Sequence, residues 1–344
     1  MKKTKPKYPI DQCALYKCRS RKKLESLLSI EQGDLRNIQS AIKYSSFEID
    51  KKDSTDKRTI TAPMRTIKAV QARIFTLIQR IERPEWLISG EKGKCYIDNG
   101  KAHVDSAYVL AMDIKKFYDN CKRDYVYRFF LNKMQTAPDV AKILTDIVTY
   151  KGGIPTGCPT SQLIAYYAYE DMFKQIQSCA ESYGCIFTLY VDDMTFSSKD
   201  PFPHEKLLHE IDVILRQYGH KPKYKKVAFY SKNKAKPITG TIVTPGHELK
   251  IPNRLQEKIY SGFQEIKKLS EAESEENEKI DRAAQTLLGQ VQAARSIDDQ
   301  RFPEVARLTR RIQANRVPQN DRRPNRSTHR KTKGKIHIPK PRPN

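Results

Sequence analysis

Two adjacent acids between two apolar runs constrain the fold of this chain most strongly. Residues 185–190 read Cys-Ile-Phe-Thr-Leu-Tyr, Val191 precedes Asp192 and Asp193, and residues 194–197 read Met-Thr-Phe-Ser. This pattern predicts a β-hairpin with both carboxylates at its tip, because consecutive strand residues point to opposite faces and a tight turn brings neighbours together. Paired carboxylates suit Mg²⁺, which takes oxygen ligands. For an isolated acid pair, a solvated turn is the simpler interpretation.

A third acid in a similar context favours the metal site. Asp113 follows the apolar run of residues 108–112, which predicts a second strand. Phosphoryl transfer through two metal ions needs carboxylates from at least two elements of the fold. We therefore predict that Asp113, Asp192 and Asp193 are catalytic and hold two Mg²⁺ ions. Tyr118 comes five residues after Asp113, where its ring could lie under the sugar of an incoming nucleotide, or else pack in the core.

Between these two strands lies a loop rich in Gly, Pro and hydroxyl residues. It spans residues 152–162, includes Pro155, Thr156 and Gly157, and precedes an apolar run with helical character at 163–176. Glycine lets a backbone approach a ligand closely, and a helix N-terminus favours phosphate. Taken alone, the segment is equally typical of an ordinary loop in which Thr160 or Ser161 caps a helix.

Together, the three segments resemble reverse transcriptases in order and spacing. Asp113-Ile-x-x-Phe-Tyr118, Ile154-Pro-Thr-Gly-x-Pro-Thr-Ser161 and Tyr190-x-Asp-Asp193 match the first palm acid, the template and nucleotide loop, and the YxDD turn of that family. The resemblance implies an α+β right-hand polymerase fold, with fingers, a palm built on an antiparallel sheet and a helical thumb. The nucleotide-binding residues that it implies are Arg58, Lys68, Tyr118, Pro155, Thr156, Gly157 and Lys226.

Two further segments resemble the retron branch of bacterial reverse transcriptases. Residues 99–103 read Asn-Gly-Lys-Ala-His, with Gly100 where Ala is usual, and residues 238–240 read Ile-Thr-Gly, with Ile for Val. The resemblance implies a cognate structured non-coding RNA, an RNA-linked single-stranded DNA product, deoxynucleoside triphosphates as substrates, and antiphage defence with a separate effector protein. It makes Asn99, His103, Thr239 and Gly240 candidate RNA-binding residues, with a structural role as the alternative for His103.

Charge supports a phosphate-bearing partner. The 344 residues carry 64 Lys and Arg against 40 Asp and Glu, a formal net charge of +24. This excess does not separate RNA from DNA or from an anionic membrane. However, no apolar run approaches the roughly 20 residues of a spanning helix, and a secretory signal is not evident, so a cytoplasmic protein is expected. The seven cysteines lack the spacing of a zinc site and are expected to be reduced.

Periodicity and breaks divide the chain into four expected parts. We predict N-terminal helices and fingers over residues 1–108, with a hairpin near 46–61, and a palm over 109–245. A thumb of three helices is predicted over 246–315. Residues 316–344 contain ten Lys or Arg, one acid and five prolines. That composition predicts a disordered tail that binds RNA or a partner.

Two alternatives stay open at this stage. One is another bacterial reverse transcriptase, either of the group II intron type or a defence enzyme unrelated to retrons. The other is an RNA-binding scaffold that has kept the fold without catalysis, which the three intact acids disfavour.

Overall fold

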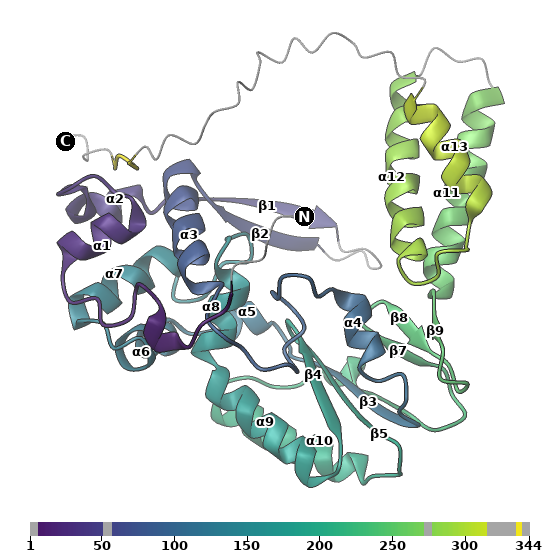
Figure 1. Ribbon diagram of the computed structural model, residues 1–344, viewed down its shortest axis with the longest axis horizontal. Helices are drawn as coiled ribbons and strands as arrows, with labels where there is room; N and C mark the ends of the chain where they lie inside the picture. The colour runs from purple at the N-terminus through teal and green to yellow at the C-terminus, as the bar shows by residue number, and fades with distance from the viewer. Residues whose placement is uncertain (1–5, 51–56, 272–276, 315–334, 339–344) are drawn as a thin grey trace.

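The computed structural model describes residues 6–50, 57–271, 277–314 and 335–338 (Figure 1). Its centre is an antiparallel sheet of four strands in the order β4-β5-β3-β6. These strands are β3 (Tyr108–Asp113), β4 (Ile186–Tyr190), β5 (Asp193–Ser198) and β6 (Ala228–Tyr230). The α+β class expected from the sequence is confirmed.

Strand β3 is buried on both faces, and its alternating side chains join two different cores. Leu110 and Met112 belong to the main core, which also takes in helices α9 (Glu170–Ser182) and α10 (His204–Gln217). Val109 points the other way and packs with Ile238 and Val243. Those two residues belong to a second sheet of β7 (Lys236–Ile238), β8 (Thr241–Val243) and β9 (Leu249–Lys250). The central sheet is therefore held from both sides.

The N-terminal half forms a lobe beside this sheet. The predicted hairpin is confirmed as β1 (Tyr44–Asp50) paired with β2 (Lys57–Pro63), and α3 (Arg65–Ile78) follows it. The other helices of this half and of the segment between β3 and β4 are α1 (Arg21–Leu28), α2 (Ile38–Ala41), α4 (Tyr96–Lys101), α5 (Phe117–Asn120), α6 (Arg123–Arg128), α7 (Pro138–Val148) and α8 (Ser161–Ala168). Short helical turns are η1 (Ile10–Gln12), η2 (Asp34–Asn37), the π-helix η3 (Phe129–Lys133) and η4 (Tyr224–Lys226).

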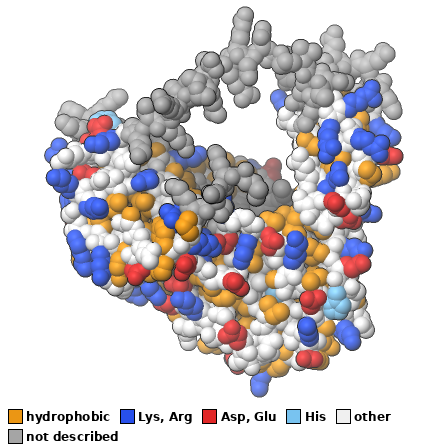
Figure 2. Space-filling view, viewed as in Figure 1, with side chains coloured by type: hydrophobic (Ala, Val, Ile, Leu, Met, Phe, Trp, Pro, Cys, Tyr) orange, Lys and Arg blue, Asp and Glu red, His pale blue; other side chains and the backbone are white. Residues whose placement is uncertain are grey.

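Three helices after the second sheet form a separate bundle, as predicted. They are α11 (Asn253–Glu271), α12 (Asn277–Arg295) and α13 (Pro303–Ala314), and they stand apart from the central sheet in Figure 1. Their apolar stripes meet in a core of their own, which includes Ile259, Leu287 and Val305. Figure 2 shows Lys and Arg side chains gathered over this bundle, to which α13 contributes the exposed Arg307, Arg310 and Arg311. No helix in the described ranges is long and apolar enough to cross a membrane.

The expected disorder of residues 316–344 is wrong for residues 335–338. The Ile336 N–H donates to the Ser29 carbonyl at 2.6 Å, and the Glu31 N–H donates to the Ile336 carbonyl at 3.0 Å. Ile338 is fully buried in the main core, and its N–H donates to Asp34 Oδ2 at 2.9 Å. Composition had indicated a tail without a core, whereas two isoleucines one residue apart are enough to dock a short extended segment. The rest of the predicted tail lies outside the described residues.

Candidate active site

The fold brings the three predicted acids to one end of the central sheet. Strand register pairs Asp113 of β3 with Asp193 of β5, and Tyr190 of β4 with Asp193 across a two-residue turn. Asp192 lies in that turn, and its carbonyl accepts the Ile114 N–H at 3.0 Å. Acids that are far apart in the sequence thus become neighbours through antiparallel pairing.

Electrostatics at this end of the sheet favour a cation. Burial, followed by the charges of Asp192 and Asp113, raises the pKa of Asp193 to about 6. The ammonium of Lys226 forms an ion pair with Asp113, which is 7 % exposed. Burial alone would lower the pKa of Lys226, but its bond to Asp113 and the surrounding acids raise it. The site therefore holds excess negative charge that one lysine balances only in part.

An open pocket of about 330 Å³ adjoins the acids. Asp113 and Asp193 line it together with Lys226 and with Thr239 from the turn between β7 and β8. With Asp192 in the adjacent turn, these carboxylates form an oxygen-only donor set, which fits hard divalent cations. The predicted lysine and two residues of the Ile-Thr-Gly segment, Ile238 and Thr239, therefore line the same pocket as Asp113 and Asp193.

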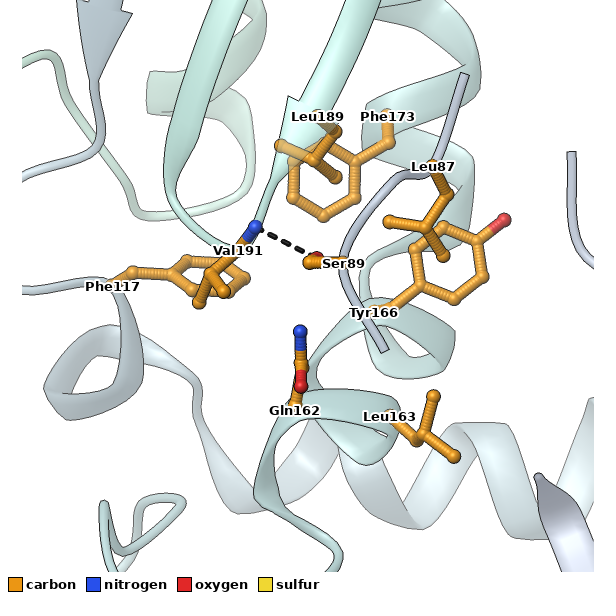
Figure 3. Close-up of a pocket in the computed structure, with 9 residues that line it drawn as sticks. All are labelled: Leu87, Ser89, Phe117, Gln162, Leu163, Tyr166, Phe173, Leu189 and Val191. Atoms are coloured by element: carbon orange, nitrogen blue, oxygen red, sulfur yellow. Dashed lines mark hydrogen bonds between the residues drawn. The ribbon is translucent and has the colours of Figure 1, made fainter. Parts of the chain in front are cut away.

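The turn that carries Asp192 has a strained backbone. Val191 has φ 62°, and a β-branched residue is rarely found at positive φ. Positive φ at the first turn residue is typical of a type II′ hairpin, where Gly is favoured. The Val191 N–H donates to Ser89 Oγ at 2.8 Å (Figure 3). Sequence reasoning missed Ser89, which lies 102 residues upstream in a segment without a motif.

The loop before α8 is fixed to strand β2. The Gly157 N–H donates to the Thr61 carbonyl at 2.9 Å, and a Cβ at position 157 would lie only 2.7 Å from that oxygen. The Thr61 N–H donates to Thr156 Oγ1 at 3.4 Å, and Pro155 is buried. The loop that carries the predicted nucleotide-binding residues Pro155, Thr156 and Gly157 is therefore held against β2.

The remaining nucleotide-binding candidates differ in exposure. Tyr118 is half-buried and packs on Phe117, with the ring centroids 5.6 Å apart. Part of its ring therefore packs against the main core, as the alternative interpretation of this residue expects. Lys68 is exposed on the first turn of α3. The backbone of Arg58 lies in β2, while its side chain is outside the described part of the chain.

The two retron-like segments contact each other beside the central sheet. Asn99 is fully buried and donates from Nδ2 to Thr239 Oγ1 at 2.6 Å. A Cβ at Gly100 would lie 2.2 Å from Thr241 Oγ1, so any larger residue at position 100 would force a neighbour to shift. Thr239 is half-buried and Gly240 exposed, both with positive φ in the β7–β8 turn. The turn faces solvent, as do Lys101 and Ala102 of the first segment.

The prediction that His103 contacts RNA is wrong for this structure, because the side chain is fully buried. Its Nδ1 lies 2.6 Å from Ser197 Oγ, and its Nε2 lies 2.7 Å from Thr188 Oγ1. Burial lowers the pKa of His103 to about 3, so the ring is neutral. Since Thr188 lies in β4 and Ser197 in β5, the imidazole links the two strands that carry the acidic turn. The structural alternative for His103 thus agrees with the structure.

A four-stranded antiparallel sheet with three acids at one end, flanked by a helical bundle, defines a fold of the right-hand polymerase class. Comparison with known families agrees, since the family described as "Reverse transcriptase (RNA-dependent DNA polymerase)" matches residues 49–269, well over half of the chain. The chain belongs to this family.

Curated relatives narrow the branch. The chain is 29% identical over 201 residues to the Retron Se72 reverse transcriptase of Salmonella heidelberg, and the aligned region covers 57% of this chain and 53% of that protein. It is 24% identical over 244 residues to the Retron Ec86 reverse transcriptase of Escherichia coli, and here the aligned region covers 70% of this chain and 72% of that protein. The match thus spans about half of the first relative and most of the second. The resemblance to bacterial retron-type reverse transcriptases is confirmed.

Proposed function

We propose that the protein is the RNA-directed DNA polymerase of a retron. It copies part of a cognate structured non-coding RNA into an RNA-linked single-stranded DNA, from deoxynucleoside triphosphates, in the cytoplasm. The observation that carries the proposal is the convergence of Asp113, Asp192 and Asp193 at one end of the sheet, beside an open pocket. A role in antiphage defence with a separate effector protein belongs to the same proposal, by analogy with retrons.

The three acids would hold two Mg²⁺ ions, which lower the pKa of an attacking 3′-hydroxyl and neutralise the triphosphate and the departing pyrophosphate. The donor set supports this assignment, because it offers carboxylate oxygens and because burial, followed by the charges of Asp192 and Asp113, raises the pKa of Asp193. Lys226 then changes partner. Its ammonium, now paired with Asp113 at the rim of the pocket, is expected to move to the phosphates of the nucleotide.

The arrangement of the lobes suggests where substrates lie. We assign the N-terminal helices and fingers to residues 1–108, the palm with interleaved fingers elements to 109–245, and the helical thumb to 246–315. The basic residues of 316–344 are assigned to contacts with RNA or a partner. Thr156 and the half-buried ring of Tyr118 are expected to face the nucleotide, together with Lys68 and Arg58 from the fingers. The exposed arginines of α13 and the Thr239-Gly240 turn are expected to contact the RNA or the RNA–DNA duplex.

The test is to express the gene with its native upstream flank and to extract total nucleic acid. The extract is run before and after RNase and debranching treatment. The Asp192→Ala/Asp193→Ala double variant is compared with Asp200→Ala, which alters an exposed acid beyond β5. A discrete small DNA that shifts on RNase treatment, and is lost only in the double variant, is the expected result.

Other outcomes separate the alternatives. If no such DNA forms but purified protein extends a DNA primer on an RNA template with Mg²⁺, the retron assignment falls and another bacterial reverse transcriptase replaces it. Failure of both assays, with RNA binding retained, would identify a non-catalytic scaffold.

A further inference from the structure

The peptide that carries the acidic turn depends on a residue outside all of the family motifs. Residues 86–89 lie beside β4, where Leu87 forms an isolated parallel bridge with Leu189. The Leu189 N–H donates to the Trp86 carbonyl at 2.9 Å, and the Ile88 N–H donates to the Leu189 carbonyl at 3.0 Å. This pairing delivers Ser89 to the end of β4, where the chain turns.

At that point, Ser89 meets the strained residue of the turn. Ser89 is 4 % exposed, and its hydroxyl accepts the Val191 N–H at 2.8 Å. Figure 3 shows the two residues facing each other in a small pocket whose walls are mainly apolar, with Phe117 on one side and Leu163 and Tyr166 on another. In such surroundings a backbone N–H without an acceptor is costly, because little water is available to replace the lost bond.

We propose that Ser89 is a positioning residue that holds the Val191 peptide at positive φ and thereby directs the Asp192 carboxylate toward the metal ions. The inference deepens the proposed polymerase function and rests on it. Val191 is the residue that makes Ser89 necessary. Gly would adopt the same φ without strain, whereas a β-branched side chain favours a rotation of the peptide that Ser89 prevents. Because Asp192 is the next residue, that rotation would displace its carboxylate.

The test is a double-mutant cycle between the two positions, in the full-length protein. Ser89→Ala is expected to raise the Mn²⁺ dissociation constant, measured by electron paramagnetic resonance, and to lower kcat on a primed RNA template, each by about tenfold. In the Val191→Gly background, the same substitution is expected to change both quantities by less than about threefold, because the turn no longer needs the serine. Ser89→Thr keeps the hydroxyl and is expected to retain wild-type metal binding.

Thr136→Ala is the matched control. It removes another buried hydroxyl, one that donates to the main-chain carbonyl of Phe130, away from the acids. It should lower stability without changing Mn²⁺ affinity. Equal effects of Ser89→Ala in the wild-type and Val191→Gly backgrounds, or an unchanged Mn²⁺ affinity, would overturn the proposal. Metal binding is measured without polymerisation, so wild-type protein that binds Mn²⁺ but copies no RNA would refute the proposed function and still decide the role of Ser89.

Discussion

Replacing Asp193 with Asn is expected to stabilise the metal-free protein at neutral pH while abolishing polymerisation. Burial and the neighbouring acids raise the pKa of Asp193 from 3.8 to about 6. Two pKa units correspond to about 3 kcal/mol. An acid whose pKa is raised in the folded state contributes stability that is complete below its unfolded pKa and is lost as the pH rises through its folded pKa. The wild type therefore loses up to about 3 kcal/mol between pH 4 and pH 7, and an Asn at this position does not.

The measurement is the melting temperature of both proteins from pH 4 to pH 8, in EDTA. For a chain of this size, about 2 °C per kcal/mol is expected, so the variant should exceed the wild type by about 5 °C at pH 7 and by little at pH 4. Excess Mg²⁺ should narrow the difference, because a cation that binds the folded wild type stabilises it by mass action.

Asp200→Asn is the control, since it makes the same substitution at an exposed acid beyond the same strand. A difference between the Asp193 variant and the wild type that stays constant from pH 4 to pH 8 would refute the reasoning. So would a variant that is less stable than the wild type at pH 7, because the acids would then stabilise the fold.

Three further changes test the parts that hold the site. His103→Ala should lower the free energy of unfolding, measured by urea denaturation, by about 3 kcal/mol, because it leaves a cavity and two buried hydroxyls without their imidazole partner. An unchanged free energy of unfolding with weaker RNA binding would restore the interpretation that His103 contacts RNA. Gly157→Ala should lower the free energy of unfolding by about 1–3 kcal/mol, since the new Cβ would press on the Thr61 carbonyl. Gly289→Ala, in a helix with open space around it, should leave stability unchanged or raise it in the same thermal assay. Ile338→Asp should abolish the hydrogen-exchange protection of the Glu31 amide, which donates to Ile336. Lys335→Glu, at an exposed position, should preserve that protection. Protection that survives Ile338→Asp would show that the docking does not depend on the buried isoleucine.

Much of the fold and the centre of the site could be predicted because their determinants are local in the sequence. The acidic hairpin has both strands and its turn within residues 185–198, and the three helices of the bundle each show an apolar stripe at helical spacing. Asp113 could be found because it ends a strand in the same way. Lys226 was placed by family resemblance, and the structure puts it in contact with Asp113.

The features that sequence reasoning missed depend on contacts between distant residues. His103 is buried because its two partners come from strands 85 and 94 residues away, and a lone histidine gives no indication of that. The docking of residues 335–338 depends on hydrogen bonds with Ser29, Glu31 and Asp34, which composition cannot reveal. The close contact of Gly157 with β2 likewise joins distant segments, and the sequence of the loop gives no indication of it.

Several of these distant contacts hold the hairpin that carries Asp192 and Asp193. Three carboxylates lie at the end of the sheet, where burial and then the charges of Asp192 and Asp113 raise the pKa of Asp193, so ionisation of this site disfavours the folded hairpin that carries two of the acids. His103 links its two strands from within the core, Ser89 holds its turn, and β3 fixes its register against Asp113. Each contact is made by neutral groups, which add no charge that would compete for a metal ion. The strained turn and the neighbouring carboxylates are therefore held in place by contacts outside the motifs by which the family is recognised.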